Sequence, residues 1–152
     1  SEMRAPMGLA VYGCDRCQEV CPRNAGWLAR EKPENARVAA KASDFQLPRL
    51  LHMDREYFLS RIWPHMFYMA DTDLWRWKMN VARAMANTGD RDFVPHLRRA
   101  WEDNGDVRVR AMIAWALGRL GGPAARQALE GFRGEASGQA AGEIDAALAD
   151  LP

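Results

Sequence analysis

Hydrophobic positions recur at helical spacing in the second half of the chain, and the same pattern occurs twice. Residues 77–89 align with residues 109–121 at an offset of 32, with small or branched apolar side chains at matching positions. Residues 143–151 resume the pattern as a partial third copy. Repetition of a two-helix unit at a period of about 30–45 residues is typical of an α-solenoid. The pattern therefore predicts an all-α fold with about two and a half repeats.

Each repeat is predicted to contain a second helix with one apolar face. A glycine, Gly89 or Gly121, follows the first helix of each copy, as expected just past a helix C-terminus. The second copy opens at Asp106, continues with Val109 and Arg110, and in this respect resembles a HEAT-like repeat. The apolar faces of the second helices contain Phe93, Val94, Leu97 and Trp101 in the first copy and Ala125, Ala128, Leu129 and Phe132 in the second.

The chain is predicted to divide into three parts. Residues 1–27 form an irregular half-ferredoxin segment, residues 28–72 a helical linker region packed on the solenoid, and residues 73–152 the HEAT-like repeat domain. In the linker region a helix begins after Asp54, a good N-cap, and ends or kinks at Pro64 unless this proline opens the next helix. A dense apolar patch beside this proline is interpreted as core packing rather than as a ligand site. It contains Trp63, Met66, Phe67, Tyr68 and Met69.

The most informative chemistry lies near the N-terminus, where Cys14, Cys17 and Cys21 fall within eight residues and Pro22 follows. The spacing C-x2-C-x3-C-P is the latter part of the bacterial ferredoxin ligand run, in which thiolates hold 4Fe-4S clusters. A cluster of this kind takes four thiolates, and the chain has three cysteines. The spacing therefore predicts a partial ligand set and a chain cut from a longer protein.

Two other interpretations of the cysteines are open. Zinc would need a histidine as a further ligand, but tetrahedral sites usually pair two short ligand motifs, and no histidine lies at such spacing from a cysteine. Purely structural thiols would not require so specific a run of cysteines followed by Pro22 and Asn24. The histidines stand apart in the sequence and are expected to be ordinary surface or core residues. They are His52, His65 and His96.

Composition excludes several classes of protein. Lys and Arg number 21 and Asp and Glu 20, so the net charge of +1 gives the whole chain no strong preference for polyanions. No apolar run approaches the roughly 18 residues of a membrane span, so a cytoplasmic protein with no membrane contact is expected. An odd number of clustered cysteines favours a reducing compartment and a metal site over disulfides. No Walker loop, G-x-G-x-x-G or Ser-His-Asp pattern indicates nucleotide binding or hydrolysis.

Residues 11–24, V-Y-G-C-D-R-C-Q-E-V-C-P-R-N, resemble the second cysteine motif of the epoxyqueuosine reductase family, in which a HEAT-like domain follows the motif. The resemblance implies that Cys14 and Cys17 ligate one 4Fe-4S cluster, together with cysteines of an upstream segment, and that Cys21 completes a second cluster. It also implies an upstream cobalamin-binding domain, whose corrinoid takes electrons from the clusters and reduces the epoxide of a tRNA wobble nucleoside. Arg23 stands where the family commonly has Trp, which indicates a paralogous branch.

Arginine is concentrated in the repeats. Between residues 76 and 133 there are eleven basic side chains and six acidic ones, and ten of the eleven are Arg, which suits bidentate contact with phosphate. The hypothesis is a tRNA-facing surface at one inter-repeat turn, and the alternative is a solvated helix face. The hypothesis fails for the first two arginines if they point into the core layer or pair with Glu102 and Asp103. The predicted nucleic-acid-binding residues are Arg98, Arg99, Arg108 and Arg110.

The sequence therefore predicts the C-terminal part of an iron-sulfur electron-transfer reductase, with a HEAT-like module that binds tRNA or a protein partner. By itself the chain is expected to be inactive and to hold no intact cluster, because half of the cluster ligands and the corrinoid domain lie upstream. Val11, Tyr12, Val20 and Trp27 are expected to pack the N-terminal residues on the helices. The alternative function is a non-enzymatic scaffold that binds a protein partner and carries a redox or structural iron-sulfur segment.

Overall fold

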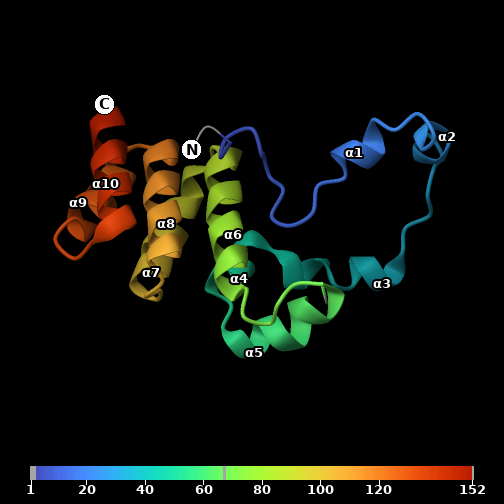
Figure 1. Cartoon of the computed structure of the whole chain (residues 1–152), viewed down its shortest axis with the longest axis horizontal. Helices are drawn as coiled ribbons and strands as arrows, with labels where there is room; N and C mark the ends of the chain where they lie inside the picture. Colours follow the sequence, from blue (N-terminus) through green and yellow to red (C-terminus); the bar gives the residue numbers. More distant parts are fainter. Residues whose placement is uncertain (1–2, 67, 152) are drawn as a thin grey trace.

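The computed structural model describes residues 3–66 and 68–151, and within these ranges it is helical and contains no β-strand. This confirms the prediction of an all-α fold. Five longer helices form the body of the molecule (Figure 1). They are α6 (Leu74–Thr88), α7 (Val94–Glu102), α8 (Val107–Leu120), α9 (Pro123–Phe132) and α10 (Gly138–Asp150).

The five helices pack in two layers. The first layer places α8 between α6 and α10, and the second contains α7 and α9, each packed on α8 (Figure 1). Close packing of α6 and α8 is possible because small side chains, among them Ala82 and Ala114, are fully buried at their contact. Since α6 and α8 contain the two copies of the apolar pattern, the predicted helical repeat is confirmed.

Local sequence signals set the ends of these helices. Gly89 follows α6 with a φ of 74°, in the left-handed region where a side chain would be strained. Asp106 precedes α8, and its side chain accepts a hydrogen bond from the backbone N–H of Arg108 at 2.9 Å. Pro123 is the first residue of α9, where its missing N–H costs nothing because that position has no helical acceptor.

The second helices bury the apolar faces that the sequence predicts. Seven of the eight predicted side chains on α7 and α9 are buried, while Phe93, which ends the short turn η4 (Arg91–Phe93), is half-buried. Trp101 and Phe132 join the two helices by parallel stacking, with ring centroids 4.4 Å apart and planes inclined by 6°. Stacked aromatic pairs of this size contribute strongly to a core.

Residues 47–65 form a second, smaller group of helices against the lower end of α6 (Figure 1). They comprise α4 (Leu47–His52), α5 (Arg55–Tyr57), the π-helical turn η2 (Phe58–Ile62) and the 3-10 turn η3 (Trp63–His65). Asp54 caps α5 as predicted, because its carboxylate accepts from the backbone N–H of Tyr57 at 2.7 Å. Pro64 is the second residue of η3, so it opens this next short helical turn directly after η2.

The predicted apolar patch beside Pro64 is only partly core. Met69 is buried, and its carbonyl accepts a 2.8 Å hydrogen bond from the half-buried indole of Trp63. Tyr68, in contrast, is 63% exposed, and Phe67 lies outside the described residues. The core interpretation therefore holds for Met69 and fails for Tyr68.

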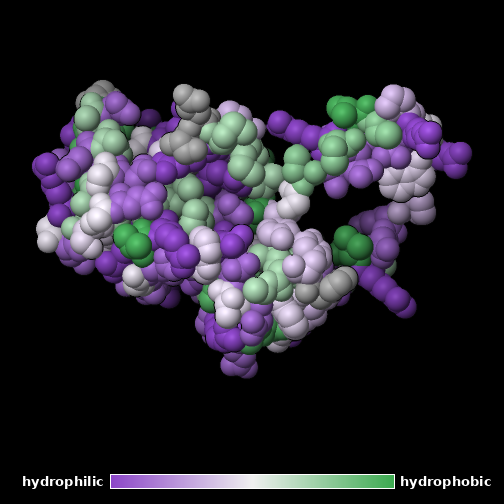
Figure 2. Space-filling model, in the orientation of Figure 1, coloured by the Kyte–Doolittle hydropathy of each residue, from purple (hydrophilic) through white to green (hydrophobic). Residues whose placement is uncertain are grey.

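Residues 13–45 form a thin arm that leaves the body and returns to it, with open space between the two in the space-filling view (Figure 2). Its helices are single turns: α1 (Arg16–Glu19), α2 (Ala25–Leu28), α3 (Ala36–Ala39) and η1 (Ala42–Phe45). Val11 and Tyr12 pack on the body as predicted, but the prediction is wrong for Val20 and Trp27, which are 79% and 60% exposed. Both lie on the arm beyond the reach of the helices, and the Trp27 ring is covered by the Lys32 ammonium at 3.4 Å.

Candidate iron-sulfur segment

The cysteine segment, residues 13–24, is a tight turn of chain built around α1. The carbonyl of Asp15 accepts from the backbone N–H groups of Gln18 and Glu19 at 2.8 and 2.9 Å, which closes the turn. Cys17 lies within α1, Cys14 precedes it and Cys21 follows it. A single helical turn therefore separates the first and last thiols.

A side chain closes the second half of this segment into a loop. The amide of Asn24 donates to both the carbonyl and the side-chain oxygen of Gln18, at 3.0 and 2.9 Å. Because Cys21 lies between Gln18 and Asn24 in the sequence, these bonds close a loop that contains the last cysteine, just after α1. Gln18 and Asn24 thus give the residues between the cysteines a physical role that spacing alone does not show.

The thiols are available as ligands. Cys14 and Cys17 are exposed, Cys21 is half-buried, and all three are free rather than joined in a disulfide. Thiolates are the soft donors that iron-sulfur clusters take, and three of them supply part of a four-ligand set. Over residues 3–66 and 68–151 no group of three or more His, Cys, Asp or Glu side chains converges on a site that could hold a metal ion. The donor chemistry fits a cluster whose remaining ligands come from outside this segment.

The arginines predicted to bind nucleic acid occupy two helices, α7 and α8. On α7, Arg98 lies 3.5 Å from Glu102 and Arg99 lies 3.4 Å from Asp103, in i,i+4 pairs. This is the arrangement that counts against the hypothesis for these two residues. Exposed pairs of this kind contribute little free energy, and the side chains of Arg98 and Arg99 stay 63% and 72% exposed. Nucleic-acid binding by α7 stays a prediction.

The arginines of α8 are engaged by different groups. Arg108 pairs with Asp106 at 2.6 Å, and its guanidinium lies over the Trp75 ring, 3.5 Å from the ring centroid. Arg110 donates to the carbonyl of Asn104 at 2.6 Å. The structure therefore gives each of the four arginines a local acceptor.

The surrounding hollows separate the four arginines further. Arg98 lines two adjoining hollows of about 350 and 340 Å³ between α7 and α9, and Arg99 lines the second of them. Arg108 instead lines a hollow of about 260 Å³ with Arg4, Trp75 and residues of α8. A single ligand at one hollow would therefore not contact all four side chains.

A polar junction between α4 and α7 was not indicated by the sequence. His52 Nε2 and His96 Nδ1 are 3.3 Å apart, and Asp103 lies 4.0 Å from His52 Nδ1. Burial, followed by the charge of Arg99, lowers the pKa of His52, and burial also lowers the pKa of the nearby Lys78. Since 44 residues separate the two histidines, no local pattern could have predicted their contact.

No helix among the described residues combines the length and the apolar character that crossing a membrane would require.

Known proteins resemble this chain both in its repeats and over most of its length. Residues 68–148 match the family model of HEAT repeats, which confirms the HEAT-like character predicted for the second half of the chain. Epoxyqueuosine reductase of Bacillus subtilis (strain 168) is 31% identical over 133 residues, which are 85% of this chain and 33% of that protein. The Bacillus cereus enzyme of the same name is 29% identical over 133 residues with the same coverage. The chain thus spans about a third of the length of these relatives.

Solved structures of epoxyqueuosine reductase have the same fold as this chain. Epoxyqueuosine reductase from Bacillus subtilis superposes with a TM-score of 0.76 and 26% identity, over 100% of this chain and 40% of that chain. A second structure of epoxyqueuosine reductase, bound to an epoxyqueuosine-modified tRNA stem loop, gives a TM-score of 0.75 and 25% identity, over 99% and 40% of the two chains. The likeness includes the cysteine segment, because it covers nearly the whole chain.

Proposed function

Because this chain belongs to the HEAT-repeat family and is homologous to the C-terminal ~40% of epoxyqueuosine reductase, we propose that it is the corresponding part of an iron-sulfur electron-transfer reductase that acts on tRNA. The observation that carries the proposal is the set of three free thiols within eight residues around α1, in a chain of which nearly the full length matches epoxyqueuosine reductase. The reductase activity belongs to the longer protein.

In this proposal Cys14 and Cys17 ligate one 4Fe-4S cluster and Cys21 ligates a second. Such clusters accept and release single electrons. The chain itself contributes three thiolates, and the bonds from Asn24 to Gln18 close the short loop that contains Cys21. The other ligands, and a corrinoid that would receive the electrons, are supplied from outside this chain.

Iron content tests the cluster part of the proposal. The chain is reconstituted anaerobically with iron and sulfide, beside a variant in which all three cysteines are replaced by serine. We expect fewer than the roughly four irons per chain of a complete cluster, all lost in the serine variant. Equal iron in the two proteins would refute ligation by the cysteines. A stable cluster of about four irons on one chain would refute the shared ligand set.

The HEAT-like helices are proposed to contact tRNA. Support comes from the relative bound to a tRNA stem loop and from the excess of arginine between residues 76 and 133. Phosphate competes with the exposed carboxylates of Glu102 and Asp103 for Arg98 and Arg99, because such surface pairs hold weakly. Binding through these two side chains would be salt-dependent, since each phosphate contact releases counterions.

The test measures affinity for a tRNA anticodon stem loop at several salt concentrations. The double variant Arg98→Glu, Arg99→Glu is expected to bind more weakly and with a smaller salt slope, by roughly one to two. Arg133→Glu, which changes an exposed arginine directly after α9, is the control for net charge and is compared with Arg98→Glu alone, because each alters the net charge by two. No affinity of the wild-type chain for the stem loop would refute RNA binding and favour the alternative function, a scaffold that binds a protein partner.

A further inference from the structure

The residues ahead of the cysteine segment lie along α6 in a regular order. The amide of Asn87, near the end of α6, donates to the carbonyls of Arg4 and Gly8 at 3.0 and 2.9 Å. Near the start of α6, the buried Trp77 ring stacks on Tyr12, with centroids 5.6 Å apart and planes inclined by 13°. Residues 3–12, here called the N-terminal strap, therefore run antiparallel to α6 and end two residues before the first cysteine.

Between these two contacts lies Arg83, a charged side chain that is only 3% exposed. Its guanidinium donates to the carbonyl of Ala10 and, at 2.8 Å, to the sulfur of Met7, so both acceptors belong to the strap. Its Nε has no hydrogen-bond partner, and no carboxylate of the described residues pairs with it. A buried charge is costly unless it is hydrogen-bonded, so the buried Arg83 guanidinium needs the acceptors that the strap supplies.

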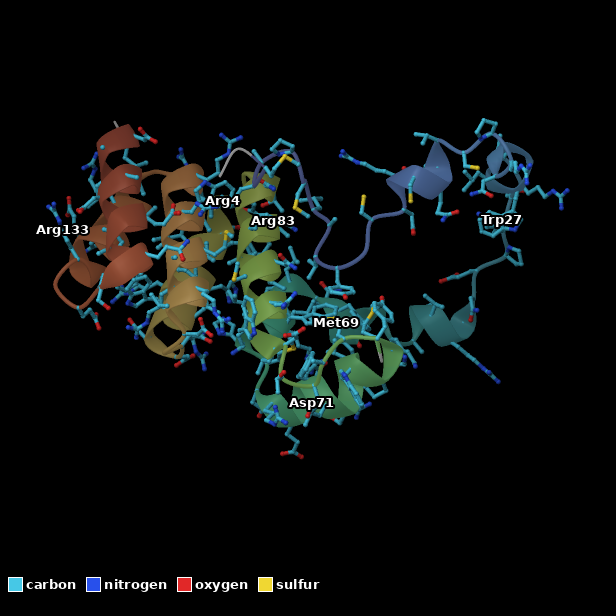
Figure 3. All side chains as sticks on the ribbon, in the orientation of Figure 1. Arg4, Trp27, Met69, Asp71, Arg83 and Arg133 are labelled. Carbon is cyan, nitrogen blue, oxygen red and sulfur yellow. The ribbon has the colours of Figure 1, made fainter. Side chains whose placement is uncertain are left out.

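An ion pair joins the strap to the rest of the first layer. Arg4 forms a two-pronged pair with Glu143 of α10, with one of its two bonds at 2.7 Å, and lies 5.5 Å from the centroid of the Trp115 ring of α8. Arg4 and Arg83 lie at the same end of the helices, beside the strap (Figure 3). The strap is thus bound by side chains of α6, α8 and α10.

A single residue connects the strap to the first cysteine. Gly13 joins Tyr12 to Cys14 and has a φ of 74°, a conformation that other residues rarely adopt. Beyond Gly13 the chain leaves the helices (Figure 1). The position of Cys14 is therefore set by Tyr12, the last side chain of the strap that packs on α6.

We propose that Arg83 and Asn87 are positioning residues for the cysteine segment: they fix the strap on the first HEAT-like helix, and the strap fixes where the cluster ligands begin. The HEAT-like helices would then have a task besides binding a partner, which is to present the thiols in one place. This inference rests on the proposed role of the cysteines as cluster ligands.

A distance measurement tests the inference without any cluster. One spin label is placed on Cys14 in a chain carrying Cys17→Ser and Cys21→Ser, and the other at Gln127→Cys on the exposed face of α9. Pulsed electron paramagnetic resonance should give one narrow distance distribution. Arg83→Met removes the charge and both strap contacts while keeping a long apolar side chain, and it should broaden or split the distribution. Asn87→Ala removes only two hydrogen bonds from a half-buried side chain, so the chain should stay folded. This variant should also broaden or split the distance distribution.

The controls separate positioning from general stability. Arg133→Met makes the same chemical change at the opposite end of the bundle (Figure 3) and should leave the distribution narrow. Thermal unfolding of each variant, followed by circular dichroism, reports on the helices alone. The inference is overturned if Arg83→Met and Asn87→Ala keep the wild-type distribution. If reconstitution instead gives no cysteine-dependent iron, the proposed function fails, while the distance result still decides whether α6 positions the segment.

Discussion

Replacing Gly118 with alanine would test how closely α8 and α10 approach each other. A Cβ atom on Gly118 would lie 2.6 Å from the Cβ of Ala147 and 3.2 Å from its Cα. Carbon atoms in contact are normally about 3.5–4.0 Å apart, so the helices would have to separate by about 1 Å or distort locally. The control is Gly142→Ala on α10, where a new Cβ would meet no atom within 4 Å.

Both substitutions raise helix propensity, but only Gly118→Ala also overpacks a helix contact. Alanine favours a helix over glycine by up to about 1 kcal/mol, so Gly142→Ala should stabilise the protein by that amount or less. Overpacking in a close-packed contact typically costs about 1–3 kcal/mol. Gly118→Ala should therefore be destabilising by roughly 0–2 kcal/mol, and the two variants should differ by about 1–3 kcal/mol.

Urea unfolding followed by far-ultraviolet circular dichroism measures this difference. We expect the midpoint to move in opposite directions for the two variants at an unchanged slope, because the surface exposed on unfolding stays the same. If Gly118→Ala proves as stable as Gly142→Ala, the contact between α8 and α10 is looser than described. The small residue would then not be required for packing the repeats.

Three further predictions concern the core, a helix cap and a titrating side chain. Phe132→Ala should lower the free energy of unfolding by about 3–5 kcal/mol and shift the fluorescence of Trp101, its stacking partner. Asp106→Ala should cost about 1 kcal/mol in urea unfolding through loss of the α8 cap, whereas Asp73→Ala, at an α6 N-cap without a capping bond, should cost less. The lowered pKa of His52 means that the unfolded chain binds a proton more readily, so stability should fall as pH drops below about 6.5, and less so in His52→Gln.

The repeat domain could be predicted because its signals are local. The caps and ends at Asp106, Gly89 and Pro123 lie next to the helices they delimit, and the buried faces follow from helical spacing. The three cysteines fall around the single helical turn α1 for the same local reason, and their role as cluster ligands stays a prediction. The predicted packing of Val20 and Trp27 on a distant surface was wrong, whereas that of Val11 and Tyr12 was correct.

The sequence by itself determined the helices, the repeat and the cluster of three cysteines, because each is written in the local spacing of residues along the chain. The tertiary structure decided which side chains meet across the fold. It brought His52 to His96, gave the predicted arginines local acceptors, and laid the strap along α6 through Arg83, which is 73 residues from Ala10. Such contacts are fixed only when helices pack, because the position of each partner then depends on every element between them.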